Sequence, residues 1–326
     1  MRKRTNRSSV SYKLTAISTA ALVGLFTIFS ITPAHAETIR HSDHLMPTGK
    51  GWGIEHSNPP PSVTTGNGIN YHGGPIMAGT PNVYFIWYGN WTSGPNPSDS
   101  VTTQNLLDAL FGTGGIGGSG YEDINQTYGS NTADVSGNLV LKASTTVGYS
   151  QGPRLSDSKV QNVVASAIGS GSLPVDPNGI YFVLTSSDVS ESSGFCSRYC
   201  GWHYRATING TDLKYAFVGN PDRCPSACEM QTTSPNHDSG ADGMASIMAH
   251  ESEEMLTDPD LNAWYDSSGN ENADKCAWKF GPITGFIGAG AYNQTIAGRH
   301  WLIQMNWENA AGGGCAQTLN GAFYSR

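Results

Sequence analysis

The chain has 326 residues, of which only 13% are charged, and a formal net charge of −8 at neutral pH. Asp and Glu outnumber Lys and Arg by 26 to 18, which argues against nucleic acid or an anionic membrane as the partner, because both attract clustered cations. The length suits one large domain or two small ones.

The first 36 residues have the three parts of a secretory signal peptide. A basic start without acidic residues precedes an apolar run from Leu14 to Ile31, and Ala34-His35-Ala36 places small residues where a signal peptidase reads them. An uncleaved membrane anchor is the alternative, but Thr and Ser interrupt the run. We therefore expect residues 1–36 to be removed and the protein to be secreted, with no membrane contact afterwards. The remaining chain has 13 Lys and Arg against 26 Asp and Glu.

Residues 37–70 contain three consecutive prolines and no hydrophobic period, which predicts an extended leader or a short pro-segment. Residues 71–326 are expected to form the globular domain, in which strands and helices alternate. Strands are expected at 83–88, 138–149, 180–184 and 213–218, with a last apolar run at 301–305. Helices are expected at 100–111, 156–169 and 241–257. This order predicts a single α/β domain in which helices pack on a mixed sheet.

All six cysteines lie in the C-terminal half, namely Cys196, Cys200, Cys224, Cys228, Cys276 and Cys315. An even number in an exported chain predicts three disulfides. The two C-x3-C pairs could instead bind zinc, and the spacing does not decide the connectivity. We expect the first four cysteines to pair among themselves and Cys276 to pair with Cys315.

The helix predicted at 241–257 is the most informative segment. It should end before Pro259, because proline disfavours helical geometry at the preceding residue. On a helical wheel one face is apolar, formed by Met244, Ile247, Met248 and Met255. Glu251 falls in the middle of this face, and His250 and Glu254 lie one turn apart on its edge. A buried Glu is costly unless it is paired, hydrogen-bonded or near a metal.

His250 and Glu254 are spaced so that both could bind one zinc ion. Glu251 would then hold the general-base position of the zinc-peptidase motif H-E-x-x-H, although this chain reads H-E-x-x-E. The helix could thus be zincin-like. The segment 264–276 is predicted to turn back over the helix, which makes Glu271 the first choice for a third ligand and Asp274 the second. Three further carboxylates are weaker candidates: Asp258, Asp260 and Asp266.

Two other interpretations of these charges stay open. They could form a solvated helix face without a metal, or an oxygen-rich site that holds calcium, which prefers carboxylates over imidazole. The isolated histidines are expected to be structural, and His203, close to Cys200, is the first to reconsider as a ligand.

Several segments, taken in order, resemble the EXORDIUM family of secreted, phosphate-induced proteins. They lie at residues 71–75, 85–91, 183–189, 194–203, 218–228, 242–244 and 298–315. The resemblance implies an extracellular protein that is tied, in plants, to cell-wall and growth responses, without an established enzymatic activity. The plant pattern is apolar where this chain has H-E-S-E-E at residues 250–254. Microbial relatives that carry H-E-x-x-E look like metal-binding, peptidase-like proteins.

Two hypotheses follow for the function. The leading one is a secreted zinc-dependent peptidase that acts on a peptide or protein, with Glu251 as the general base. His250 and Glu254, together with Glu271 or Asp274, would hold the metal. The alternative is a non-catalytic secreted protein of the EXORDIUM type that binds a cell-wall or cell-surface component.

Overall fold

The computed structural model describes residues 46–48, 63–92, 94, 96–310 and 312–324. All of them belong to one compact unit, residues 36–326. The predicted signal peptide, residues 1–36, lies outside the described residues. Within the described ranges, no helix is both long and apolar enough to cross a lipid bilayer.

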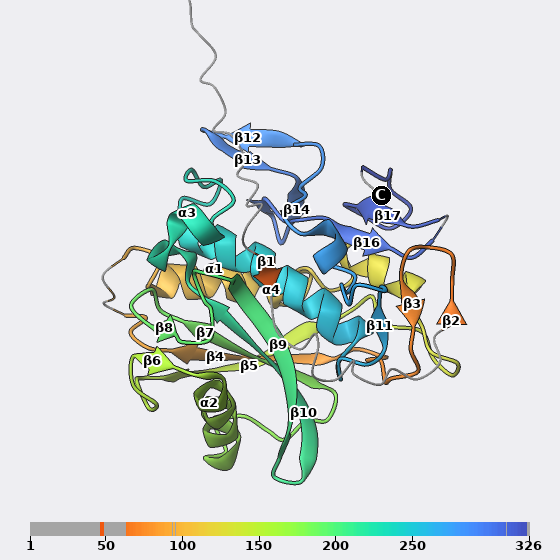
Figure 1. Ribbon diagram of the computed structural model, residues 1–326. Coiled ribbons are helices and arrows are strands. Elements are labelled where there is room, and N and C mark those ends of the chain that lie inside the picture. Colours follow the sequence, from red (N-terminus) through yellow and green to blue (C-terminus); the bar gives the residue numbers. More distant parts are fainter. Residues whose placement is uncertain (1–45, 49–62, 93, 95, 311, 325–326) are drawn as a thin grey trace, which may run out of the picture. The chain divides into compact units, whose positions relative to one another are not determined.

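A six-stranded mixed sheet forms the centre of the fold, with the strand order β1-β9-β10-β7-β4-β5 (Figure 1). Its strands are β1 (Met46–Thr48), β4 (Asn82–Tyr88), β5 (Val140–Val147), β7 (Gly179–Thr185), β9 (Tyr199–Ile208) and β10 (Thr211–Gly219). Only β9 and β10 pair antiparallel, joined by a two-residue turn in which Asn209 and Gly210 both have positive φ. Four of these strands match the sequence prediction, whereas β1, which lies in the predicted leader, and β9 were not predicted as strands.

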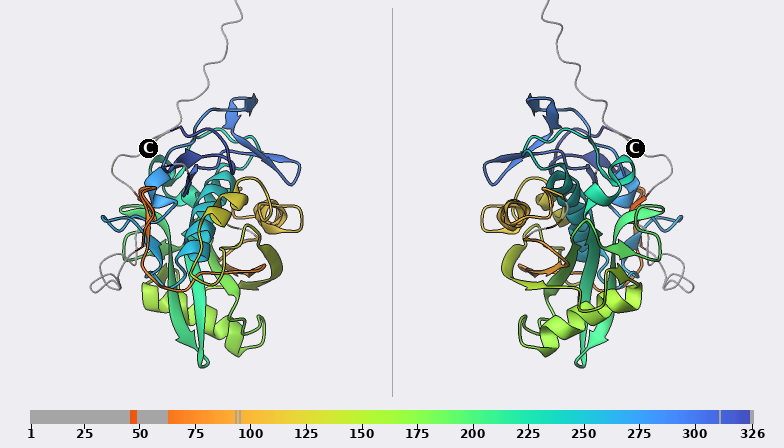
Figure 2. Two further views of the ribbon diagram at one scale, coloured as in Figure 1. Left: turned by 90° about the vertical axis from the view of Figure 1, so that its right-hand side faces the viewer. Right: turned by 90° about the vertical axis from the view of Figure 1, so that its left-hand side faces the viewer.

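Helices cover both faces of this sheet. Helix α2 (Asp157–Gly169) lies on one face, and α1 (Val101–Phe111) and α4 (Ser239–Thr257) lie on the other (Figures 1 and 2). Shorter helices are α3 (Pro225–Cys228), η1 (Glu122–Thr127), η2 (Pro221–Arg223) and η3 (Asp274–Cys276). This layering confirms the predicted α/β domain with a mixed sheet, while a zincin-like role for α4 stays a prediction.

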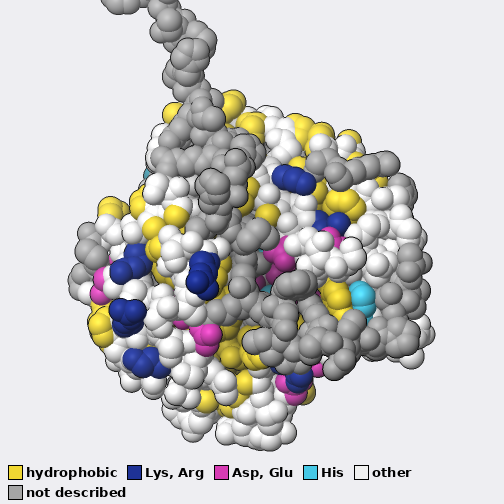
Figure 3. All heavy atoms as spheres, viewed as in Figure 1, with side chains coloured by type: hydrophobic (Ala, Val, Ile, Leu, Met, Phe, Trp, Pro, Cys, Tyr) yellow, Lys and Arg dark blue, Asp and Glu magenta, His cyan; other side chains and the backbone are white. Residues whose placement is uncertain are grey.

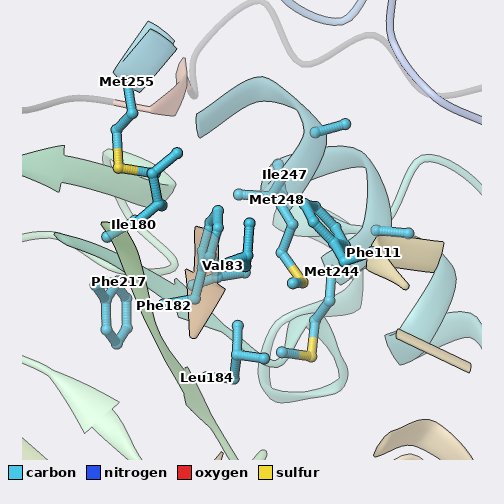
Figure 4. Close-up of a cluster of buried hydrophobic side chains, with 14 of the residues drawn as sticks. Val83, Phe111, Ile180, Phe182, Leu184, Phe217, Met244, Ile247, Met248 and Met255 are labelled. Atoms are coloured by element: carbon cyan, nitrogen blue, oxygen red, sulfur yellow. The ribbon is translucent and has the colours of Figure 1, made fainter. Parts of the chain in front are cut away.

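The core lies between α4 and the sheet. Every residue of β7 is buried, as is every residue of β4 after Asn82, which explains their continuous apolar sequences. Figure 4 shows the predicted apolar face of α4 in this core: Met244, Ile247, Met248 and Met255 gather with Val83, Phe182 and Phe217. The helical-wheel prediction of that face is therefore confirmed.

Small two- and three-stranded sheets surround the central one. They comprise β2 (Val63–Thr64), β3 (Asn70–Tyr71), β6 (Arg154–Leu155), β8 (Ser190–Glu191), β11 (Trp264–Tyr265), β12 (Gly285–Ile287), β13 (Gly290–Tyr292), β14 (Gln294–Ile296), β15 (Arg299–Trp301), β16 (Asn306–Glu308) and β17 (Gly314–Ala316). The apolar run 301–305 is thus a strand only at Trp301, since residues 302–305 lie outside any strand. The hairpins β12 to β17 lie on the side of α4 that faces away from the sheet (Figures 1 and 2).

Helix α4 is therefore enclosed on all sides, and its residues from Gly240 to Thr257 are all buried. The alternative of a solvated helix face is therefore wrong, because the C-terminal hairpins cover the side of α4 that the sheet leaves open. The charged residues of the H-E-x-x-E segment lie inside the protein. Any function proposed for this segment must account for charged side chains that are buried.

Three disulfides join Cys196 to Cys224, Cys200 to Cys228, and Cys276 to Cys315. This confirms the expected pairing and removes zinc binding by the C-x3-C pairs. Of the predicted leader, residues 37–70, the described parts include β1 and β2, and Ile69 is fully buried. Whether the leader is removed, and where, stays a prediction.

Candidate metal centre

Helix α4 supplies the first two candidate ligands. His250 and Glu254 lie one turn apart, so the Nε2 atom of His250 is 2.8 Å from Oε1 of Glu254. The side-chain amide of Gln304 lies 2.8 Å from Nδ1 of the same histidine and holds the ring in place. The helix begins with Asp238 as its N-cap, which accepts a hydrogen bond from the backbone N–H of Ala241.

Strand β9 supplies a second imidazole, which the leading sequence hypothesis did not include. Nε2 of His203 lies 3.0 Å from Oε2 of Glu271 and 3.5 Å from Oε2 of Glu254. The hairpin sequence Asn209-Gly210 was the available signal, because a two-residue turn of this type fixes a strand on each side. Extending the hairpin back from that turn places His203 on β9, opposite Ala216 of β10.

The return segment after β11 brings two more carboxylates over α4, as the sequence predicted. Glu271 faces His203, and Oδ1 of Asp274 lies 3.6 Å from Nε2 of His250. The backbone N–H of Asp274 donates to Oε1 of Glu254, and the disulfide of Cys276 anchors the end of the segment. Helix, strand and return segment therefore meet at Glu254.

The three weaker candidates serve the surrounding structure instead. Asp258 accepts hydrogen bonds from the backbone N–H groups of Asn262 and Ala263, both at 2.6 Å, and so shapes the loop after α4. Asp260 forms an ion pair with Lys214 at 2.7 Å, and Asp266 accepts from the turn around Asn270.

Glu251 lies against the backbone of β9. A Cβ atom on Gly201 would be only 2.9 Å from Oε1 of Glu251, so glycine is what lets the strand pass this close. Glu251 is fully buried, and neither of its carboxylate oxygens has a hydrogen-bond partner among the described residues. An ionised carboxylate in this position needs a ligand or a proton.

Two groups of three side chains place their ligand atoms within 4.8 Å of one another. One is His203, Glu251 and Glu254, and the other is His250, Glu254 and Asp274. Imidazole nitrogen and carboxylate oxygen together are an ordinary zinc ligand set. Two imidazoles fit zinc better than calcium, which takes oxygen ligands. The donor set therefore fits a transition metal, with Glu254 shared by both groups.

The electrostatics of the centre follow from its burial. Burial, with neighbouring carboxylates adding to it, raises the pKa of Glu251 and Glu271 well above their usual range and that of Glu254 to about 7. Burial also lowers the pKa of His203 to about 3, which keeps its ring neutral. For His250 burial opposes protonation, but Glu254 and Asp274 outweigh it and hold the pKa well above its ordinary value. A divalent cation would remove the repulsion among these carboxylates.

The centre is closed to solvent in this structure. His203, His250, Glu251 and Glu254 are at most 1% exposed. An open pocket of about 520 Å³ lies elsewhere, at β6 and β8, where it is lined by Arg154, Arg198 and Arg223 among others. Figure 3 shows Lys and Arg side chains gathered over that region, at the left of the face. The candidate metal ligands and the open pocket therefore lie in different parts of the protein.

Comparison with known proteins agrees with the resemblance seen in the sequence. Residues 69–316 match the family described as phosphate-induced protein 1 conserved region. "Protein EXORDIUM-like 3" and "Protein EXORDIUM-like 5" of Arabidopsis thaliana are each 32% identical, over 74% and 73% of this chain and 80% and 75% of their own lengths. "Protein PHOSPHATE-INDUCED 1" of Nicotiana tabacum is 25% identical, over 68% of this chain and 76% of its own.

No solved structure is significantly similar to the chain. The family match covers the central sheet except β1, helix α4 and the segment that returns over it, and it also includes all six disulfide-bonded cysteines. The chain belongs to the EXORDIUM family of phosphate-induced proteins.

Proposed function

We propose that this chain is a secreted protein of the EXORDIUM type that acts at the cell surface or cell wall and holds a zinc ion in the centre beneath α4. Membership of the family supports the first part, because the resemblance seen in the sequence implies an extracellular protein tied, in plants, to cell-wall and growth responses. Three disulfides support it as well, because such bonds persist in oxidising compartments.

One observation carries the metal-binding part. Two imidazoles and two further carboxylates lie around Glu254 inside the protein, and together these groups come from α4, β9 and the return segment. Buried charges of like sign are stable when they are protonated or when they coordinate a cation. His250, Glu254 and Asp274, whose ligand atoms lie within 4.8 Å of one another, would bind the ion, and His203 and Glu271 would complete the set or orient Glu254.

A second candidate function, a metal-dependent peptide hydrolase, has one specific observation in its favour. Glu251 lies beside the proposed ligands and has no hydrogen-bond partner among the residues the structure describes. Zinc, when bound, would polarise the carbonyl of a peptide. Glu251, which lies beside the proposed ligands, would take the proton of the attacking water.

Metal analysis of the purified mature protein tests the proposal. Wild-type protein should retain one zinc per chain after dialysis against buffer without metal. Glu254→Gln should lose the zinc, because the residue shared by both ligand groups is gone. Glu253→Gln is the matched control: Glu253 is equally buried on the same helix, but its partner is Asn306. No transition metal in wild type, or equal loss in both variants, would contradict the proposal.

Glu251→Gln separates the two candidate functions. The variant should keep its zinc, since the remaining ligand group does not use this residue. If the protein is a hydrolase, the variant should lose peptide hydrolysis by two orders of magnitude or more, roughly the contribution of a general base. If zinc-loaded wild type and variant are equally inactive on peptides, the hydrolase candidate is wrong and the binding protein remains.

A further inference from the structure

Strand β1 occupies the edge of the central sheet beside the candidate centre. It pairs parallel with β9, Met46 opposite Tyr199 and Thr48 opposite Gly201. Within the described sheet, β9 would be the outermost strand without it. The edge of a sheet offers a row of backbone N–H and C=O groups, which a further strand can satisfy. The leader of the chain thus fills a place that any extended polypeptide could take.

This edge runs directly past the candidate ligands. Gly201, the partner of Thr48, is the residue whose Cα approaches Glu251, and His203 follows two residues later on the same strand. Strand β1 also lies against α4 and η3, the two elements that carry His250, Glu254 and Asp274 (Figure 1). A segment on this edge therefore covers the centre.

The pairing of β1 is short, which makes it displaceable. It has two registered pairs, whereas β9 and β10 share eight. Pro47 lies between the two paired residues and has no N–H to give, a position that proline tolerates only in an edge strand. The three disulfides all lie after residue 195, so none ties β1 to the sheet.

We infer that the edge of β9 is a strand-addition site for an extended peptide, and that residues 46–48 of the leader occupy it in the intact chain and close the metal centre. Strand addition selects a partner by its main-chain hydrogen bonds, so the class of ligand is an unfolded or extended polypeptide segment. The short leader strand can compete with a separate peptide for this edge because it belongs to the same chain, which gives it a high effective concentration there. Displacing or cutting it opens the edge and the centre together.

This inference rests on the proposed function in one respect only, that a metal lies beneath the edge. The experiment compares the full secreted chain with its Thr48→Pro variant, which removes a backbone N–H from the paired strand. Met46→Pro is a second releasing variant. Pro47→Ala is the matched control, because it changes the same three-residue strand but removes no backbone donor.

A labelled synthetic peptide with the sequence of residues 41–50 is the probe, and its binding is followed by fluorescence anisotropy. The proline variants should bind the peptide at least about tenfold more tightly than wild type or Pro47→Ala, the difference expected from freeing a small number of backbone hydrogen bonds. Hydrogen exchange should show faster exchange at β9 residues 199–202 in the proline variants, reversed by the peptide. Equal peptide binding by all four proteins, or unchanged exchange at β9 in both proline variants, would overturn the inference.

The zinc content of the same samples distinguishes the two proposals. Peptide binding at β9 in protein that holds no zinc would leave the strand-addition site standing and remove the metal centre. If the protein holds zinc but neither proline variant gains affinity for the peptide, the metal centre stands and the strand-addition site is wrong.

Discussion

Glu254 divides its two carboxylate oxygens between two histidines from different parts of the chain. Oε1 lies 2.8 Å from His250 and Oε2 lies 3.5 Å from His203. The sequence predicted the first partner, because residues four apart on a helix face each other. It did not predict the second, because that contact depends on how β9 packs against α4. Local spacing thus reveals half of a site and tertiary packing supplies the rest.

Asp242 provides a test of the pH dependence at the start of α4, away from the candidate ligands. Burial raises the pKa of its carboxyl to about 7 from an ordinary 3.8, although Ser234 and Asn236 donate to it. The folded state therefore holds a proton that the unfolded chain releases. The Asp242 carboxyl therefore contributes to the free energy of unfolding below about pH 4, and this contribution is lost as the pH rises toward 7.

Asp242→Asn cannot ionise, so its free energy of unfolding should fall less than that of wild type between pH 5 and pH 7.5. Urea unfolding followed by circular dichroism at the two pH values measures this. Parallel changes in the two proteins would show that the carboxyl does not titrate in this range.

Among the elements, helices α1, α2 and α4 and strands β4, β5, β7 and β10 follow from patterns that each segment carries in itself. Strand β9 does not, because its sequence mixes Gly, Cys and charged residues without simple alternation. Its register comes from pairing with β10 through the Asn209-Gly210 turn. The helical wheel likewise could not predict that α4 is buried on its second side, because the hairpins that cover this side come from a later part of the chain.

The N-cap of α4 stabilises the helix locally, so the loss of stability on removing it can be predicted. Asp238 accepts from Ala241 N–H at 2.9 Å and also receives the hydroxyl of Thr103 at 2.6 Å. Asp238→Ala should lower the free energy of unfolding by about 1–2 kcal/mol. Ser156→Ala is the control, because Ser156 precedes α2 in the N-cap position but its hydroxyl contacts Ser158 instead. Urea unfolding should show a much smaller loss for Ser156→Ala, and equal losses would contradict the capping role.

At the scale of the whole molecule, disulfides hold the regions on both sides of the centre. Cys276–Cys315 joins the return segment to the C-terminal hairpins across a separation of 39 residues, and Cys196–Cys224 spans 28 residues near β9. The number of bonds was predictable from the sequence, and the pairing of Cys276 with Cys315 was expected, although the spacing alone does not decide it. The choice of partners among the first four cysteines was not, because only the folded chain brings each pair together.

Replacing both Cys276 and Cys315 by Ala should cost about 3–4 kcal/mol of unfolding free energy, the entropy of the loop released in the unfolded chain. It should also weaken zinc retention, because Asp274 lies two residues from the bond. The pair Cys196→Ala and Cys224→Ala should cost a similar free energy and leave the zinc in place. Urea unfolding and metal analysis of both double variants check this, and zinc retained by both would show that the bond does not position the centre.

One metal ion is proposed to join α4 and the return segment beside β9. Anomalous X-ray scattering at the zinc absorption edge, from crystals of the mature protein, tests it most directly. We predict a single peak at bonding distance, about 2.0–2.2 Å, from Nε2 of His250 and from one oxygen each of Glu254 and Asp274. A map without that peak, in which the imidazoles and carboxyls remain hydrogen-bonded to one another, would contradict it.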